Sequence, residues 1–266
     1  MSGTSFTLAD ARRTLHELTP RTVMLIGSVA DSGIPIPDSE WTVGQAAAHL
    51  AVGAQLYAQY AQGIARPALI DRTDLAGSHR RKLAELTTQG TPQLGADLQL
   101  GIDTFLTAIE ERGADEPLPW HQGTLPCITM TGLLIGEQLL HGYDIAQALD
   151  IEWPIGDQPA RLTVQAIRPM LPALVDREAA MRINTAYELA IDGGSRVIVR
   201  FHNGTASIGP ADGTAIDCQL SGDPVAWLLA LYGRVSWEQL LRTGRVRVTS
   251  GDAALGKAFK QLLRNP

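Results

Sequence analysis

The chain of 266 residues contains little cysteine and no long apolar run. Its two cysteines, Cys127 and Cys218, are too few for a disulfide scaffold and fit a reducing compartment. No segment reaches the roughly 18 unbroken apolar residues that a membrane helix needs. The first residues, MSGTSFTLADARR, lack the basic and then apolar order of a secretion signal. These features predict a cytoplasmic protein without a membrane partner.

The sequence also lacks a stretch of concentrated positive charge. It has 22 Lys and Arg against 28 Asp and Glu, a formal net charge of −6, and its longest basic run is only residues 80–82. Because a nucleic-acid surface needs clustered positive charge to meet phosphates, we expect no nucleic-acid partner. Hydrophobic residues make up 45% and charged residues 19%, which is ordinary for a folded globular protein. A monomer and a homodimer both remain open.

The first 150 residues carry the apolar spacing of helices. Four long segments show it, at about residues 7–30, 43–63, 94–111 and 129–149, and a short charged helix is predicted at 77–88. Ser39 or Thr42 would cap the second of these helices. The segment GADEPLPWHQGTLPC, residues 113–127, is too rich in proline and glycine to predict a regular element. Long helices joined by irregular loops are typical of a helical bundle.

The pattern changes in the last third of the chain. A helix interrupted by prolines is predicted at 159–177, and alternation predicts strands at 186–191, 196–201, 205–208 and 216–220. Asp192-Gly193-Gly194 and Asn203-Gly204 are hairpin signals between them. Further elements are predicted at 224–232, 237–242, 246–248 and 253–263. We therefore divide the chain into a helical bundle at 1–155, a connecting helix or linker at 156–179, and an α+β domain at 180–266.

Glu137 and His141 lie four residues apart in an apolar segment that contains GEQLLHGYD. On a helix this spacing puts both side chains on one face, one turn apart. A buried carboxylate or imidazole without a partner is costly, so the pair needs a third polar group. His49, in the alanine-rich QAAAHL, has a comparable setting. We predict that the three converge on a divalent metal; an exposed helix pair and a core histidine bonded to a carbonyl are the alternatives.

Two histidines and one carboxylate suit zinc in an open tetrahedral site, and also resemble the facial triad of non-haem iron. Asp144 lies seven residues after Glu137 and either orients His141 or is a polar residue at the helix end. Trp120 and His121, in the loop before this helix, are candidates for the mouth of a binding pocket. For His121 the alternative is a surface loop histidine.

The same residues carry a family resemblance. WTVGQAAAHL, PWHQGTLP and GEQLLHGYDIAQALD resemble the DinB-like metal-binding bundle of mycothiol-dependent maleylpyruvate isomerases, over about residues 5–155. IDGGSRVIVRF, GDPVAWLLALYGR and LLRTGRVRVTSGD resemble the sterol-carrier-type domain that often follows it. The resemblance implies a DinB-like four-helix bundle followed by a sterol-carrier-type α+β domain. It also implies zinc held by His49, Glu137 and His141.

The resemblance further implies mycothiol as a cosubstrate. A free thiol is mostly protonated at neutral pH, and coordination to a metal deprotonates it. A thiolate beside an electrophile can add to a double bond and support isomerisation, or displace a leaving group. Arg234 matches an arginine region of the family and could hold an anionic substrate, although an arginine at a helix end also bonds free carbonyls. Because no other anion clamp is evident, we favour a mycothiol S-transferase over a maleylpyruvate isomerase.

Other readings of the sequence stay open. The second domain could hold a lipid, which would make the chain a ligand-binding protein with a structural metal, or the bundle could serve a redox or damage response. A free coordination position suits catalysis better than structure. We therefore expect the second domain to act as a lid that shapes the active-site cleft. Cys127 could be a nucleophile, but a packed bystander is the simpler interpretation.

Overall fold

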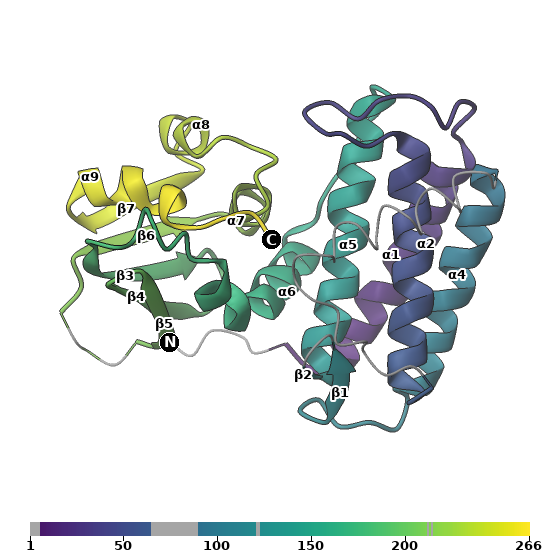
Figure 1. Ribbon diagram of the computed structural model, residues 1–266, viewed down its shortest axis with the longest axis horizontal. Helices are drawn as coiled ribbons and strands as arrows, with labels where there is room; N and C mark the ends of the chain where they lie inside the picture. Colours follow the sequence, from purple (N-terminus) through teal and green to yellow (C-terminus); the bar gives the residue numbers. More distant parts are fainter. Residues whose placement is uncertain (1–5, 65–89, 121–122, 212, 214) are drawn as a thin grey trace. The chain divides into compact units, whose positions relative to one another are not determined.

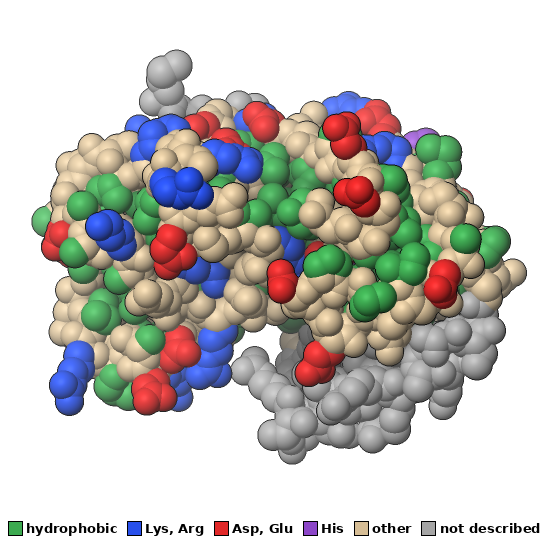
Figure 2. All heavy atoms as spheres, turned by 90° about the horizontal axis from the view of Figure 1, so that it is seen from above, with side chains coloured by type: hydrophobic (Ala, Val, Ile, Leu, Met, Phe, Trp, Pro, Cys, Tyr) green, Lys and Arg blue, Asp and Glu red, His purple; other side chains and the backbone are tan. Residues whose placement is uncertain are grey.

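The computed structural model describes residues 6–64, 90–120, 123–211, 213 and 215–266 (Figure 1). The chain forms two compact units, one of residues Thr7–Pro154 and one of Ile155–Pro266 that also includes Phe6. The predicted helix at 77–88 lies outside the described residues. Within the described ranges no helix is both long enough and apolar enough to cross a membrane. Acidic and basic side chains are interspersed over the described residues of the face in Figure 2.

The first unit is the helical bundle that the sequence predicts. Its long helices among the described residues are α1 (Leu8–Gly27), α2 (Val43–Ala61), α4 (Thr91–Ala108) and α5 (Cys127–Ala148), which lie side by side in Figure 1. Thr7 caps α1 in a capping box with Asp10, and Thr42 caps α2 in the same way with Gln45. Thr42 is therefore the cap of the two candidates, and the hydroxyl of Ser39 accepts instead from the backbone N–H of Trp41.

Small residues let the helices of the bundle approach closely. A Cβ added at Gly101 of α4 would lie 2.8 Å from the Cβ of Ala54 on α2, so these two helices meet almost backbone to backbone. Helix α5 packs against both α1 and α2. The apolar faces meet in a core whose larger members are Leu15, Ile26, Leu94, Leu98, Ile102 and Phe105. This packing sets α2 and α5 beside one another and so decides which of their polar side chains meet.

Most of the described residues in the segment before α5 form strands, and the expectation of an irregular loop is wrong. It forms a hairpin of β1 (Pro117–Trp120) and β2 (Gly123–Pro126), with Pro117 opposite Pro126 and Trp120 opposite Gly123. In a ribbon of two strands each strand has one unpaired edge, so a proline that lacks an N–H is tolerated there. The hairpin packs on α2 and α5 and holds Trp120 against the bundle.

The second unit has the predicted α+β composition. Helix α6 (Asp157–Ile167) continues as a 3₁₀ helix, η1 (Arg168–Leu174). The sheet contains β3 (Asn184–Ile191), β4 (Arg196–His202), β5 (Thr205–Pro210), β6 (Cys218–Gly222) and β7 (Val246–Gly251), in the order β5-β4-β3-β6-β7. Only the β3–β6 pair is parallel among these neighbours. The Asn203-Gly204 turn joins β4 to β5 with φ of 48° and 77°, as its sequence predicts.

The second unit also contains short helices, and aromatic rings fill its core. After the strands come α7 (Pro224–Leu231), α8 (Trp237–Arg242), α9 (Ala253–Ala258) and η2 (Phe259–Leu262). In its core the ring of Phe259 contacts those of Tyr187, Phe201 and Trp227, and Tyr187 also contacts Phe201. Helix α6 packs on α7 and η1 packs on β5, so the segment predicted to connect the domains forms part of this unit.

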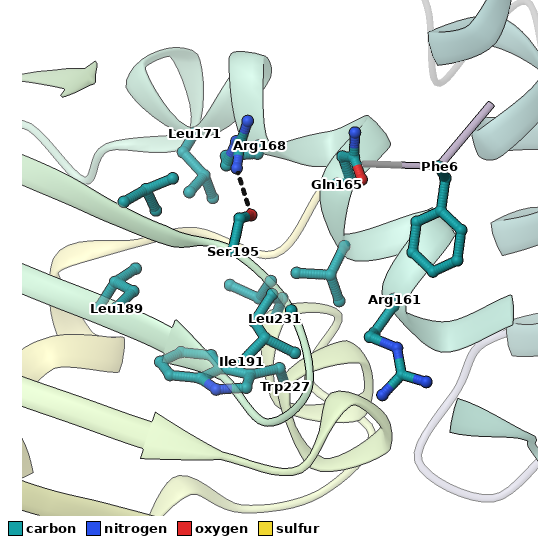
Figure 3. A pocket seen from close by; sticks show the side chains of 13 residues that line it. Phe6, Arg161, Gln165, Arg168, Leu171, Leu189, Ile191, Ser195, Trp227 and Leu231 are labelled. Atoms are coloured by element: carbon teal, nitrogen blue, oxygen red, sulfur yellow. Dashed lines mark hydrogen bonds between the residues drawn. The ribbon is translucent and has the colours of Figure 1, made fainter. Parts of the chain in front are cut away.

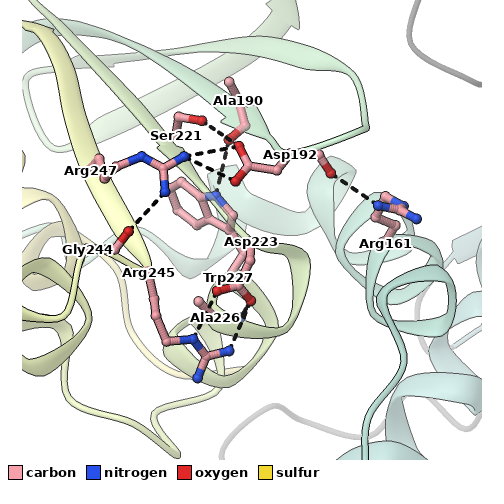
Figure 4. A network of polar contacts seen from close by, with 10 residues as sticks. All are labelled: Arg161, Ala190, Asp192, Ser221, Asp223, Ala226, Trp227, Gly244, Arg245 and Arg247. Atoms are coloured by element: carbon pink, nitrogen blue, oxygen red, sulfur yellow. Dashed lines mark hydrogen bonds and ion pairs between the residues drawn. The ribbon is translucent and has the colours of Figure 1, made fainter.

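Polar groups near the ends of β3 and β6 form a separate network (Figure 4). The carboxylate of Asp192 accepts from Ser221 at 2.8 Å and from Arg247 at 3.1 Å. Arg245 makes two hydrogen bonds to Asp223, the residue that caps α7. Each carboxylate in the network is thus paired with an arginine, so we assign the network a structural role.

Candidate metal centre

Helices α2 and α5 bring His49, Glu137 and His141 together. His49 lies two turns into α2, and Glu137 and His141 lie one turn apart on α5. One carboxylate oxygen of Glu137, Oε2, is 3.1 Å from His49 Nε2 and 3.4 Å from His141 Nε2. Each residue offers one ligand atom, and the three atoms lie within 4.8 Å of one another. Two imidazole nitrogens and one carboxylate oxygen therefore face a common point.

Glu137 and His141 stabilise each other's charged forms. Burial alone would raise the pKa of Glu137, but the hydrogen bonds and charges of His141 and His49 outweigh it and hold that pKa well below its usual range. Burial alone would lower the pKa of His141, but Asp144 and Glu137 raise it to about 9. Without a metal, this centre is thus a carboxylate paired with an imidazolium. The proton on His141 supplies the positive charge that a bound metal ion would otherwise bring to Glu137.

Asp144 lies behind His141, on the side away from Glu137. Its Oδ2 is 3.3 Å from Nδ1 of His141, without the alignment of a hydrogen bond, and both side chains are close to nine-tenths buried. A carboxylate at Nδ1 orients the imidazole and leaves Nε2 for a metal. The spacing of seven residues from Glu137 does not bring Asp144 into the triad itself.

The donors present fit a divalent metal. Nitrogen and carboxylate oxygen in this ratio are the ligands of open zinc sites and of 2-His-1-carboxylate iron sites, and the donor set does not separate the two metals. The side chain of Glu137 is 37% exposed, whereas His49 and His141 are at 20% and 13%. The centre is therefore accessible on the Glu137 side, where a further ligand would approach.

Trp41 contacts both histidines, and the sequence analysis missed it. Its indole stacks on His141 with ring centroids 5.5 Å apart and planes at 16°, and it lies 5.1 Å from His49 at 55°. The two imidazoles are 4.9 Å apart. Trp41 directly precedes Thr42, the cap of α2. The available signal was an aromatic residue directly before the cap of the helix that carries His49.

Trp120 contacts Tyr57, a second residue that the sequence analysis missed. The indole N–H of Trp120 donates to the hydroxyl of Tyr57 at 3.3 Å. Burial, and then the negative charge of Glu137, raise the pKa of Tyr57 well above its usual value, so the phenol stays protonated. Tyr57 lies two turns after His49 on α2, which was the only pattern that pointed to it. His121 lies outside the described residues.

Arg234 and the two cysteines are the remaining candidates. Arg234 belongs to the second unit and donates to the carbonyl of Tyr232, the C-cap of α7, at 2.9 Å, which is the contact that the helix-end alternative predicts. The thiols of Cys127 and Cys218 are buried, and burial raises the pKa of both. A protonated buried thiol is a poor nucleophile.

The second unit contains a small apolar pocket (Figure 3). Leu171, Leu189, Ile191, Trp227 and Leu231 are among its lining residues. Its cavity volume of about 30 Å³ holds about two water molecules. Arg168 extends into this region and donates to the Ser195 hydroxyl at 3.0 Å. A pocket of this size does not accommodate a sterol or an acyl chain.

Known proteins share both units. Residues 12–146 match the family model described as mycothiol maleylpyruvate isomerase N-terminal domain, and residues 168–264 match the SCP-2 sterol transfer family. No curated protein sequence matches the chain. A crystal structure titled mycothiol-dependent maleylpyruvate isomerase is similar with a TM-score of 0.58 and 14% identity, over 93% of this chain and 95% of that one. A histidine-to-alanine mutant of the same enzyme gives a TM-score of 0.57 and 15% identity over the same shares.

At these identities the structural likeness establishes the fold, and the family models establish the relationship. The expected fold, a DinB-like helical bundle followed by a sterol-carrier-type α+β domain, is confirmed. The family model covers just over half of the chain and includes His49 and Glu137 with His141. The chain therefore belongs to the family of the mycothiol maleylpyruvate isomerase N-terminal domain and carries an SCP-2-type domain behind it.

Proposed function

We propose that this protein binds a divalent metal, zinc in the first instance, through His49, Glu137 and His141, and uses it to activate mycothiol. The observation that carries the proposal is the convergence of three ligand atoms within 4.8 Å at a centre that is open on the Glu137 side. A bound zinc ion would supply Lewis acidity that lowers the pKa of a thiol placed in its free position. The protein would act in the cytoplasm as a monomer or homodimer.

The chain's own residues have distinct parts in this proposal. Nε2 of both histidines and Oε2 of Glu137 hold the metal, and Asp144 keeps the His141 ring in place from Nδ1. Tyr57, which stays protonated, has a hydroxyl that can donate a hydrogen bond to an oxygen of the substrate. Trp120 holds that hydroxyl by donating to its oxygen.

The reaction that we favour is attack of the mycothiol thiolate on a small electrophile, which forms a carbon–sulfur bond and expels the leaving group of the electrophile. The alternative is maleylpyruvate isomerisation, in which a thiolate adds to a double bond, the bond rotates, and the thiolate departs. The family relationship supports the isomerase. The scarcity of an anion clamp in the sequence supports the S-transferase, because a dicarboxylate substrate needs arginines. Arg234 is our candidate for such a group, and it already donates to Tyr232.

The test is elemental analysis of the purified protein, followed by X-ray absorption at the metal edge with and without mycothiol. Near-stoichiometric zinc that gains a sulfur ligand supports thiol activation. Zinc without a sulfur ligand indicates chemistry based on water. Absence of any metal, also after reconstitution, overturns the proposal and favours the alternative of a small-ligand carrier. The His49→Ala variant is the control, since it lacks one ligand and should take up no metal.

The electrophile can then be identified by product analysis. Purified protein is incubated with mycothiol and either maleylpyruvate or a small alkylating electrophile. Consumption of free thiol with a mycothiol adduct as product supports S-transfer. Conversion of maleylpyruvate to its trans isomer without net loss of thiol supports the isomerase. If the protein binds zinc and mycothiol but converts neither substrate, the metal site is supported and both reactions are rejected.

A further inference from the structure

Trp41 is held over the two histidines of the candidate metal centre by its backbone. The backbone N–H of Ile36 donates to the carbonyl of Trp41 at 2.9 Å, and that of Val43 donates to the carbonyl of Ile34 at 2.9 Å. Pro35 and Thr42 form an antiparallel bridge between these bonds. The loop from α1 is thus paired with the residues that open α2. These bonds fix the backbone position of Trp41, from which its indole reaches both imidazoles.

Close packing after Trp41 strengthens this constraint. The N–H of Gly44 donates to the carbonyl of Ser32 at 2.8 Å, and a Cβ at Gly44 would lie 2.8 Å from the Ser32 Cβ. Only a glycine permits this approach of the loop to the first turn of α2. Hence the backbone is tied down on both sides of Trp41, and the indole can leave the imidazoles only by a change of its own side-chain rotamer.

The direction of a lone pair on Nε2 follows the plane of its imidazole ring. The plane of His141 is fixed on one face by the parallel indole of Trp41 and along one edge by Asp144. The same indole also contacts the ring of His49. An indole carries only an N–H donor and no ligand atom, so Trp41 cannot itself bind the metal. It can act only by holding the ligands.

We infer that Trp41 is a positioning residue of the metal centre, one that orients both imidazoles so that their Nε2 atoms converge. The inference rests on the proposed metal binding. It gives the histidines a second support, the indole of Trp41 at the start of α2, in addition to the carboxylate of Asp144 on α5. A metal then meets ligands whose rings are already oriented. Removing the indole frees both rings, so part of the binding free energy is spent on ordering them again.

The experiment measures cobalt binding to wild-type protein, Trp41→Leu and Trp41→Phe. Co²⁺ has visible absorption bands that report the geometry of its ligands. We expect Trp41→Leu to bind Co²⁺ about 10- to 100-fold more weakly, as for other residues that support ligands, and with altered bands. Trp41→Phe keeps an aromatic face and should lie between wild type and Trp41→Leu. Trp153→Phe is the matched control, since Trp153 packs on α5 at Gly142 and donates to the carbonyl of Leu139 at 3.1 Å.

The outcomes separate this inference from the proposed function. If wild-type protein binds neither Co²⁺ nor Zn²⁺, the proposed function fails and the inference falls with it. If wild type binds Co²⁺ and Trp41→Leu binds it with the same affinity and the same absorption bands, only the role of Trp41 is overturned. If Trp41→Leu does not fold, as judged by circular dichroism, Trp41→Phe decides. An affinity and spectrum equal to those of wild type then overturn the inference, and a loss greater than that of Trp153→Phe supports it.

Discussion

Glu137 carries the electrostatics of the candidate centre, because one of its oxygens faces both imidazoles. Its pKa lies well below the usual range despite burial, so it is a carboxylate at any pH at which the protein is used. The residues around it supply the compensating positive charge as a proton on His141. At the residue scale, the proposed metal binding would therefore exchange a proton for a divalent ion.

Removal of any one ligand should abolish metal binding. We expect His49→Ala, Glu137→Ala and His141→Ala each to lower zinc affinity by at least about 100-fold and to eliminate activity. None of the three side chains belongs to the buried apolar core, so the fold should survive. Zinc content and the thermal unfolding midpoint check both halves of this expectation. Unchanged zinc content in all three variants would show that the site lies elsewhere.

Metal affinity should also depend on pH. The pKa of His141 is about 9 in the absence of metal, because Asp144 and Glu137 together outweigh its burial. The proton must leave before Nε2 can bind, so affinity should rise about tenfold per pH unit up to about 9 and then level off. Zinc titration against a competing chelator at several pH values measures this slope. In Asp144→Asn the plateau should begin at lower pH, and an identical profile would contradict the part given to Asp144.

At the scale of elements, α5 is supported by Trp153. Its indole packs against the backbone at Gly142, the residue after His141, and donates to the carbonyl of Leu139 at 3.1 Å. The guanidinium carbon of Arg21 on α1 lies 4.6 Å from the centre of the same ring. Trp153 thus links α5 to α1 next to the candidate centre, and Gly142 is what allows the ring to approach.

A side chain at Gly142 should disturb this contact. A Cβ there would lie 2.5 Å from the Trp153 ring, so Gly142→Ala must displace the indole and should destabilise the protein by about 1–3 kcal/mol. The control is Gly53→Ala in α2, where nothing lies within 4 Å of the added Cβ. Gly53→Ala should stabilise by about 0.5–1 kcal/mol through helix propensity. Urea unfolding of both variants checks the opposite signs, and two stabilising changes would reject the argument.

At the scale of the whole molecule, the chain has two units with separate cores. Every contact within the triad lies inside Thr7–Pro154, whereas the sheet and its aromatic core lie inside the second unit. We therefore expect the proposed metal binding to be separable from the fold of the second unit. The lid role that the sequence suggests for the second domain remains a proposal.

Truncation tests that separation. A chain of residues 1–154 should fold and bind zinc within about threefold of the full-length affinity, because it retains the bundle core and all three ligands. If the second unit shapes the substrate site, thiol-dependent turnover should fall sharply in the same fragment. Zinc titration and an activity assay on one preparation measure the two effects. Full activity in the fragment would rule out the lid, and loss of zinc binding would contradict the separation.

Much of the fold was predictable from local signals in the sequence. Apolar spacing predicted α1, α2, α4 and α5, the cap at Thr42 was one of two candidates, and Asn203-Gly204 predicted a hairpin. Such signals act within a few residues of the chain. The β1–β2 hairpin was missed because its prolines argue against strands. In a ribbon of two strands a proline can lie at an unpaired edge, and local sequence signals did not reveal that pairing.

The sequence by itself determined the residue types, their spacing and the family, and these suffice to propose His49, Glu137 and His141. It did not determine that they meet, because His49 and Glu137 are 88 residues apart and their distance depends on how α2 packs against α5. Trp41 and Tyr57 emerged only in the tertiary structure for the same reason. Helix formation is a local property of the chain, whereas a ring contact exists only after distant segments have packed.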